Sequence, residues 1–284
     1  MEMCSSFCKF GRSILRRWHW LAVGFLVVWA LFPILWAFSS SLKTRFEVYH
    51  TPPTFLPQVP QFENYRAVFS YPNFNSFLFN SVFLAVASLT IVVIVAVLAG
   101  YAFARHKFRF GSIAFVVIII PRIIPRASLI IPLYRIAASL GALDTYLGLV
   151  VSYSAISVPL ATWILTGFFK GIPREMEDSA RVDGASRLQT IRHIAVPMAT
   201  PALVTVIVFA LREAWNELPF VLALTTQTRM RTLQYHLLAL QDQIGIINWP
   251  VILAFTVVTI VPLVAAYMVF QRRVVSSLVS GALK

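Results

Sequence analysis

The chain has 284 residues, of which 58% are hydrophobic and only 12% are charged. Soluble domains carry about 25% charged residues, so this composition excludes a water-soluble fold and indicates an integral membrane protein. A net charge of +13 would suggest nucleic-acid binding in a soluble chain, but lysine and arginine gather in the cytoplasmic loops of membrane proteins. We therefore expect a lipid environment and no nucleic acid. The two cysteines, Cys4 and Cys8, predict neither a disulfide framework nor a metal site.

Six apolar segments are long enough to cross a bilayer, which takes about 20 residues. The first, 20–42, follows a basic N-terminal segment, 1–19, and is too long for a cleaved signal peptide, so we expect an uncleaved anchor. A Pro-rich polar stretch, 43–75, is expected to form an extended periplasmic loop with one short helix. The other five spans fall within a core of residues 76–270, at 77–104, 111–139, 143–169, 199–225 and 249–270.

The distribution of positive charge predicts the orientation. With the N-terminus inside, the inner segments hold 15 of the 24 lysines and arginines and the outer loops hold five. The inner segments are 1–19, 105–109, 170–197 and the tail 271–284. Because positive residues favour the cytoplasmic side, we expect both termini and the polar segment 171–197 to be cytoplasmic.

The polar segment 171–197 has the pattern of two short helices. Pro173 suits the first helical position, and the acidic residues that follow it suit the positive end of the helix dipole. Gly184 is expected to end the first helix in a left-handed conformation. A second, amphipathic helix then carries Leu188, Ile191 and Ile194, until Pro197 ends it.

One face of the first helix is small and mostly neutral. Met176, Ser179, Ala180 and Asp183 are spaced at i, i+3, i+4 and i+7, so they lie on the same side of a helix. Such a face fits closely against a partner, which favours a docking element over a solvated loop.

The stretch EMEDSARVDGAS resembles the EAA loop of ABC-importer permeases. Asp178, Ser179 and Ala180 stand at the E-A-A positions, Gly184 is the glycine, and a later Ile-x-Val-Pro, 194–197, closes the pattern. Further similar stretches cover nearly the whole chain: SSSLKT (39–44), ENY (63–65), IPLY (131–134), LGALDTYLGLV (140–150), WNE (215–217) and the tail QRRVVSSLVSGALK. Together they are similar to the sugar-importer branch that contains the smaller membrane subunit of the maltose transporter.

This resemblance implies an all-α, polytopic permease with six transmembrane helices and a cytoplasmic EAA coupling helix, located in the bacterial cytoplasmic (inner) membrane. The resemblance also implies that the permease is not an enzyme and that it pairs with a second, homologous permease. It implies two copies of a separate ABC ATPase, which would bind ATP and magnesium. A periplasmic or lipid-anchored binding protein would deliver a carbohydrate, with acidic or derivatised saccharides among the candidates. The implied ATPase contacts are Glu177, Asp178, Ser179, Ala180, Asp183 and Gly184, with Ser280 and Gly281 of the tail.

Charged residues also occur inside the expected spans. Arg122 and Arg126 share a face of the third span, and the fifth offers Arg212, Glu213, Trp215, Asn216 and Glu217. Isolated arginine in a bilayer costs about 2.5–3.5 kcal/mol, so these groups should face a partner or a wet cavity. Two interpretations stay open: a structural ion-pair network, or a solute path in which arginines suit an anionic saccharide and Trp215 and Asn216 suit any sugar.

The alternative class is a stand-alone secondary transporter or channel. Such a protein needs coupling-ion acids or internal repeats, and the sequence shows no clear repeat. Nucleotide-binding and hydrolytic motifs such as GxxxxGK[ST], HExxH and GxSxG are also absent from the sequence.

Overall fold

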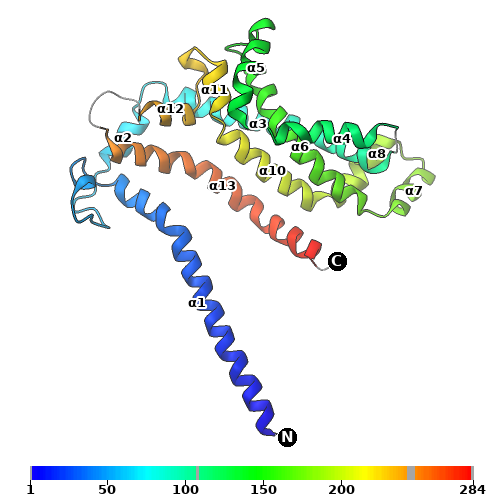
Figure 1. Cartoon of the computed structure of the whole chain (residues 1–284), viewed down its shortest axis with the longest axis horizontal. Helices are drawn as coiled ribbons and strands as arrows, with labels where there is room; N and C mark the ends of the chain where they lie inside the picture. Colours follow the sequence, from blue (N-terminus) through cyan, green and yellow to red (C-terminus); the bar gives the residue numbers. More distant parts are fainter. Residues whose placement is uncertain (1, 107–108, 242–246, 283–284) are drawn as a thin grey trace. The chain divides into compact units, whose positions relative to one another are not determined.

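The computed structural model describes the backbone of residues 2–106, 109–241 and 247–282, and the side chains of residues 18–106, 109–241 and 247–270. Its described part contains helices and no strand, which confirms the expected all-α class (Figure 1). The α-helices are α1 (Glu2–Ser41), α2 (Glu63–Phe69), α3 (Phe74–Arg105), α4 (Gly111–Ile119), α5 (Arg126–Ser139), α6 (Tyr146–Lys170), α7 (Arg174–Val182), α8 (Arg187–Thr190), α9 (Val196–Met198), α10 (Thr200–Trp215), α11 (Pro219–Leu224), α12 (Leu233–Ala239) and α13 (Trp249–Ala282). Short 3-10 helices, η1 (Glu47–Tyr49), η2 (Ile120–Arg122) and η4 (Thr228–Met230), and a π-helix, η3 (Ile191–Ala195), complete the described elements.

Four described helices are long and apolar enough to cross a membrane, and two bent pairs raise the number to six if each pair is one span. The four are Trp18–Ser41, Phe74–Arg105, Tyr146–Lys170 and Trp249–Phe270. The bent pairs are α4–η2 with α5, at 103°, and α8–α9 with α10, at 81°. Their composition and length agree with the expected six-span membrane protein.

Prolines explain where the third and fifth spans break. Pro121 and Pro125 flank the end of η2, and each lacks the N–H that a continuous helix needs. The turn before α10 lies at Ala199, between Pro197 and Pro201. The fifth span, expected to continue to Thr225, instead ends its first part at Trp215, and α11 starts with Pro219 at its first position.

The chain divides into two compact units. The first comprises Met1–Tyr71 and Gln243–Val258. Its Pro-rich loop is fixed by polar contacts: the Asn64 side chain donates to the carbonyls of Ser41 (2.8 Å) and Lys43 (3.0 Å), and Glu47 accepts from the Gln58 amide (2.9 Å). Lys43 is buried and lies over the Trp36 ring at 4.7 Å.

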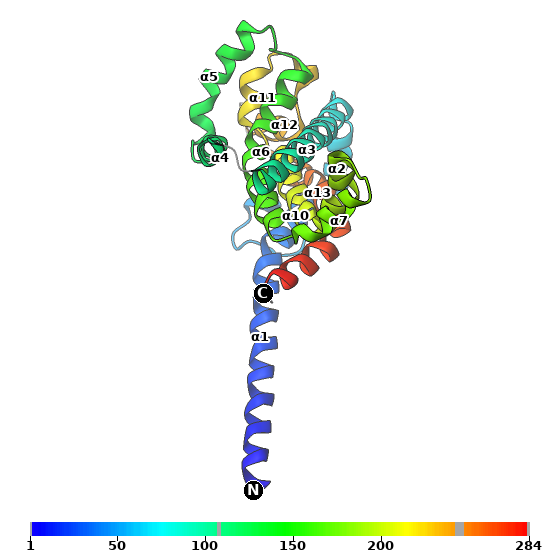
Figure 2. The same cartoon turned by 90° about the vertical axis from the view of Figure 1, so that its right-hand side faces the viewer.

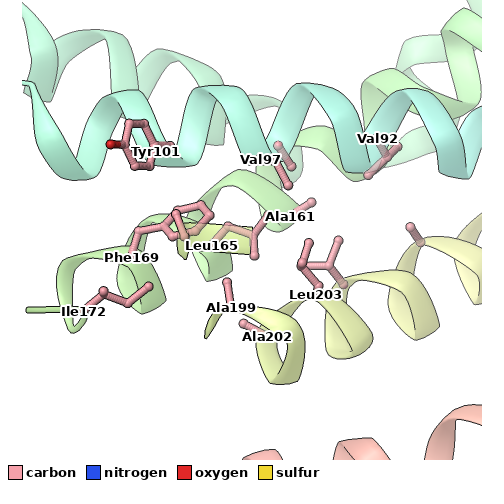
Figure 3. Close-up of a cluster of buried hydrophobic side chains, with 14 residues drawn as sticks. Val92, Val97, Tyr101, Ala161, Leu165, Phe169, Ile172, Ala199, Ala202 and Leu203 are labelled. Atoms are coloured by element: carbon pink, nitrogen blue, oxygen red, sulfur yellow. The ribbon is translucent and has the colours of Figure 1, made fainter. Parts of the chain in front are cut away.

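The second unit, Pro72–Asp242 with Thr259–Lys284, packs around α3, α6 and α10. These three helices lie side by side in Figures 1 and 2. Small residues allow the close approach: at Gly100 an added Cβ would lie 3.0 Å from the Cβ of Leu165. The core between the helices is largely alanine, valine and leucine, as Figure 3 shows for Val92, Val97, Ala161, Leu165, Ala199, Ala202 and Leu203.

Candidate functional site

The polar segment folds as a helix, a glycine turn and a second helical stretch. Pro173 has extended geometry and lies directly before α7, one position earlier than expected. α7 ends where Gly184 adopts a φ of +84°, which confirms the left-handed cap predicted for this glycine. The amides of Gly184 and Ala185 donate back to Arg181 and Ala180 (3.0 and 2.9 Å), so the turn satisfies the carbonyls at the end of α7.

The second helical stretch begins with a capping box. Ser186 accepts from the Gln189 amide, and the Gln189 side chain accepts from the Ser186 amide at 2.7 Å. Of its expected apolar face, Leu188 remains 68% exposed, whereas Ile191 is half-buried against the core. Pro197 does not end this stretch as expected: a π-helical turn precedes it, and the helix continues through Met198.

Most of the predicted contact residues of α7 are accessible. Asp178 has a side chain that is 63% exposed and pairs with Arg181, three residues away, at 3.1 Å. Ser179, Asp183 and Gly184 are exposed, and Ala180 is half-exposed. These residues therefore form one open surface at the α7 end of the second unit.

Glu177 differs from its neighbours, because it is only 2% exposed. Its carboxylate accepts from the Tyr101 hydroxyl (2.7 Å) and from Arg105 Nε (2.8 Å), and it forms an ion pair with Arg105 Nη2 (2.7 Å). Glu177, which the resemblance implies as an ATPase contact, therefore has both carboxylate oxygens bound inside the protein.

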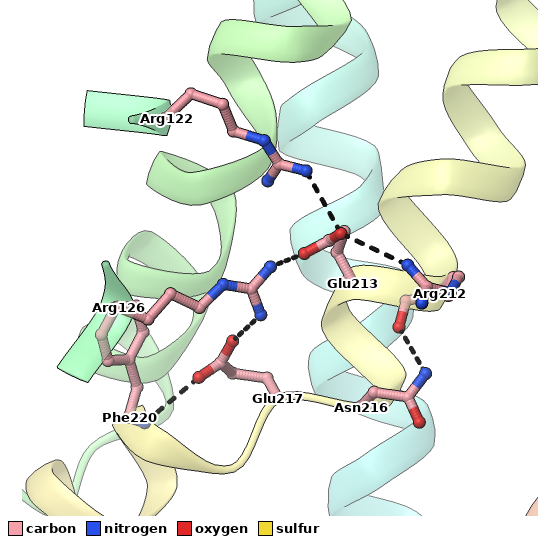
Figure 4. A network of polar contacts seen from close by, with 7 residues as sticks. All are labelled: Arg122, Arg126, Arg212, Glu213, Asn216, Glu217 and Phe220. Carbon is pink, nitrogen blue, oxygen red and sulfur yellow. Dashed lines mark hydrogen bonds and ion pairs between the residues drawn. The ribbon is translucent and has the colours of Figure 1, made fainter. Parts of the chain in front are cut away.

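The expected intramembrane charges do come together, and they form a network (Figure 4). Arg126 of α5 binds two carboxylates, Glu213 of α10 and Glu217 after it, the latter at 3.0 Å. Arg122 and Arg212 approach Glu213 at 3.4 and 3.6 Å. The side chains of Glu213 and Glu217 are 10% and 1% exposed, so the network holds two buried carboxylates between α5, α10 and α11.

Trp215 and Asn216, which one of the two open interpretations places on a solute path, differ in exposure: Trp215 is buried and Asn216 is exposed. The indole of Trp215 is buried and donates to the Thr259 carbonyl at 3.1 Å, so neither ring face is free for stacking. The Asn216 amide turns back and donates to the Arg212 carbonyl at 2.9 Å. A cavity of about 220 Å³ does lie beside the network, and it is lined mainly by apolar groups with Arg122 and Arg126 at its edge.

A further polar cluster, which the sequence did not reveal as a unit, fixes the loop after α11. Asp144 accepts hydrogen bonds from the amides of Thr226 and Gln227 at 2.7 and 2.9 Å. Burial alone would raise the pKa of the Asp144 carboxyl, but hydrogen bonds from the Thr226 hydroxyl and from these two amides outweigh it and hold the pKa below its usual value. Asn80 holds the next part of the loop by donating to the carbonyls of Arg229 and Arg231 (2.7 and 2.8 Å).

Two further predictions concern the tail of the chain and a metal site. α13 continues past the membrane-spanning segment through positions 280 and 281, but the side chains of the expected tail contacts, Ser280 and Gly281, lie outside the described residues. Within the described residues, no three His, Cys, Asp or Glu side chains gather into a metal site.

Residues 93–279 match the family model of the binding-protein-dependent transport system inner membrane component. The chain belongs to this family. The match covers α7, most of the buried core and the ion-pair network, whereas Asn80 lies before it. The protein is thus a multi-pass permease of an ABC importer, a membrane component and not the ATP-hydrolysing subunit, and these findings do not support a stand-alone transporter or channel.

Curated relatives of this permease cover nearly all of it. It is 35% identical to the sulfoquinovosyl glycerol transport system permease protein of Agrobacterium fabrum, over 94% of this chain and 93% of that one. It is 34% identical to the trehalose transport system permease protein of Mycobacterium tuberculosis, over 95% and 98%. A chain in the crystal structure of a bacterial ABC transporter that imports the acidic polysaccharide alginate has the same fold, with a TM-score of 0.78, 23% identity, and coverage of 91% and 96%.

Proposed function

We propose that this permease moves a carbohydrate into the cell as one membrane subunit of an ATP-driven, binding-protein-dependent importer. The observation that supports a carbohydrate as the solute is the similarity to permeases named for sulfoquinovosyl glycerol and trehalose transport, over nearly their full length. The solved alginate transporter, which was also crystallised with a saccharide-bound periplasmic protein, has the same fold. A separate binding protein therefore delivers the solute to this permease.

The exposed part of α7 and its glycine turn is the proposed ATPase-docking surface. Asp178 offers a carboxylate to a cationic group of the ATPase, and Ser179, Ala180, Asp183 and Gly184 allow close approach around it. Glu177 is omitted from this surface because it is buried. Ser280 and Gly281 of the tail add a second contact. The permease itself binds neither ATP nor magnesium, which belong to the ATPase.

The assembly proposed is a heterodimer of this chain with a homologous permease, above two copies of the ATPase. Both termini and α7 face the cytoplasm, in line with the excess of positive charge in those segments. The ion-pair network has a structural task, because its carboxylates are almost buried and are bound by Arg126 rather than open to a solute.

Co-purification and reconstitution test this function. A tagged permease should retain an ATPase and a second permease after solubilisation. With a binding protein in liposomes, the complex should hydrolyse ATP faster when one member of a panel of neutral and acidic saccharides is added. A purified chain that transports without ATPase would contradict the proposal, as would a complex that responds to no saccharide.

A further inference from the structure

A buried ion pair joins α7 to α3, and both oxygens of its carboxylate are hydrogen-bonded. Tyr101, Arg105 and Glu177, which we call the α3–α7 clasp, bring together residues separated by 72 to 76 positions in the sequence. The side chains of Arg105 and Glu177 are 6% and 3% exposed. Each carboxylate oxygen of Glu177 accepts at least one hydrogen bond. The buried negative charge is therefore both paired with a cation and hydrogen-bonded by protein groups.

Arg105 also binds the chain that leads into α7. Its Nη2 donates to the carbonyl of Ile172 at 2.9 Å, two residues before the first residue of the helix. One guanidinium therefore holds both the entry to α7 and its first turn. Because the guanidinium is planar and rigid, two such contacts fix orientation as well as distance.

The apolar core meets the clasp at the same place. The Tyr101 ring packs edge-on against Phe169, with ring centroids 5.8 Å apart, and Phe169 and Ile172 are buried around it. Figure 3 shows these three side chains together at one end of the core. The end of α3, the end of α6 and the start of α7 are thus packed as one body.

From this geometry we propose that the α3–α7 clasp transmits the movement of α7 directly to α3, with Glu177 as a positioning residue. The inference rests on the proposed function, in which an ATPase moves α7. Successive residues of a helix point about 100° apart, so the adjacent acids have separate tasks. Asp178 faces outward to the partner, and Glu177 faces inward to α3.

The test is the complete transporter reconstituted with its ATPase, second permease and binding protein, with solute imported per ATP hydrolysed as the readout. In Glu177→Gln we expect this ratio to fall at least about fivefold, the low end for coupling between distant sites, with the ATPase still bound. Arg105→Glu and Glu177→Arg should each lower the ratio, and the two together should recover only the part that depends on the ion pair, because the carboxylate introduced by Arg105→Glu cannot donate to the Ile172 carbonyl. Glu175→Gln, the same substitution at an exposed acid of α7, is the matched control and should leave it unchanged.

Each outcome decides the proposal. A normal ratio in Glu177→Gln would overturn it, and so would a parallel loss of import and hydrolysis, which is what a merely structural role predicts. If Glu177→Gln does not assemble, Tyr101→Phe keeps the ring and removes one donor, and a normal ratio there overturns it as well. The proposed function is judged separately, because it fails only if the wild-type complex lacks the ATPase or does not import a carbohydrate.

Discussion

Arg126 is the central cation of the intramembrane network, since its guanidinium joins the carboxylates of Glu213 and Glu217. Arg212 contacts the same Glu213 at the longer distance of 3.6 Å, and 63% of its side chain is exposed. Removing one partner of a buried pair leaves the other charge uncompensated, whereas an exposed pair contributes little. The two arginines should therefore differ in their importance for stability.

We expect Arg126→Gln to destabilise the protein by about 3 kcal/mol, at the low end for a broken buried pair because a third of the side chain is exposed. Arg212→Gln, the same chemical change, should cost less than about 1 kcal/mol. Thermal unfolding of the detergent-solubilised complex measures both. Equal losses in the two variants would show that α5 is not held by this contact.

Asp178 provides a test of docking that is independent of the clasp. Asp178→Lys reverses an exposed charge whose intramolecular contact is a surface pair with Arg181. Such surface pairs contribute little to stability, so the folded permease should persist while binding of the ATPase weakens about tenfold or more, as for a lost charge pair at an interface. Pull-down of the ATPase measures the binding.

Glu175→Lys serves as the control for the added positive charge. Unchanged binding of the ATPase in Asp178→Lys would remove Asp178 from the docking surface.

The sequence places these charges on helices but does not assign their partners. It identifies α7 and its Gly184 turn, because proline, acids and glycine mark helix ends locally. It does not distinguish Glu177 from Asp178, since the distinction depends on Arg105, 72 residues away. The sequence does not reveal the burial of Trp215 either, because its indole partner, the Thr259 carbonyl, lies 44 residues later.

At the scale of elements, α12 is attached to α3 by a buried histidine. The His236 ring stacks on Phe77 with centroids 5.1 Å apart, and the residue is 6% exposed. Burial lowers the pKa of His236 from 6.5 to about 4, because the charged imidazolium loses hydration. The packing of α12 should therefore depend on pH.

The sign of that dependence follows from proton uptake. Below pH 6.5 the unfolded state takes up a proton that the native His236 does not bind until about pH 4, so stability decreases as pH falls through this window. Between pH 7 and pH 5 we expect a loss of about 2 kcal/mol. Hydrogen exchange of the α12 amides measures it, and His236→Phe should abolish the pH dependence. The Asp144 carboxyl does not contribute, because its lowered pKa keeps it ionised across the window.

Helix breaks are the part of the fold that the sequence predicts least well. Long apolar runs give α3 and α6 directly, because length and hydropathy suffice for a membrane helix. The bends of 103° and 81° fall at prolines, but a proline in an apolar run is compatible with either a kink or a full break. In the third span the full break comes with packing of α5 against α11, a tertiary contact that the local sequence does not specify.

At the scale of the whole molecule, the second unit separates two kinds of charge. The exposed carboxylate of Asp178 faces outward beside α7, whereas the network carboxylates are bound within the helices. This separation allows one surface to engage an ATPase while the charges in the membrane are satisfied internally. It also means that the network should attract an anionic solute only weakly, because the charge of each arginine is already compensated by a carboxylate.

Replacing Arg122 tests in a transport assay whether the network attracts an anionic solute. Arg122 and Arg126 both line the small cavity, and Arg122 has the weaker hold on Glu213, at 3.4 Å, with one third of its side chain exposed. We therefore choose Arg122 as the cavity arginine to test against a solute. Because Glu213 offsets its charge, we expect Arg122→Gln to change the uptake of neutral and acidic saccharides by the same factor, within about twofold. Competitive uptake of the two classes into liposomes containing the complete transporter measures that factor, with Arg135→Gln, an exposed arginine of α5, as the control. A selective loss of acidic saccharides of tenfold or more would instead place Arg122 on the solute path and make the network part of substrate recognition.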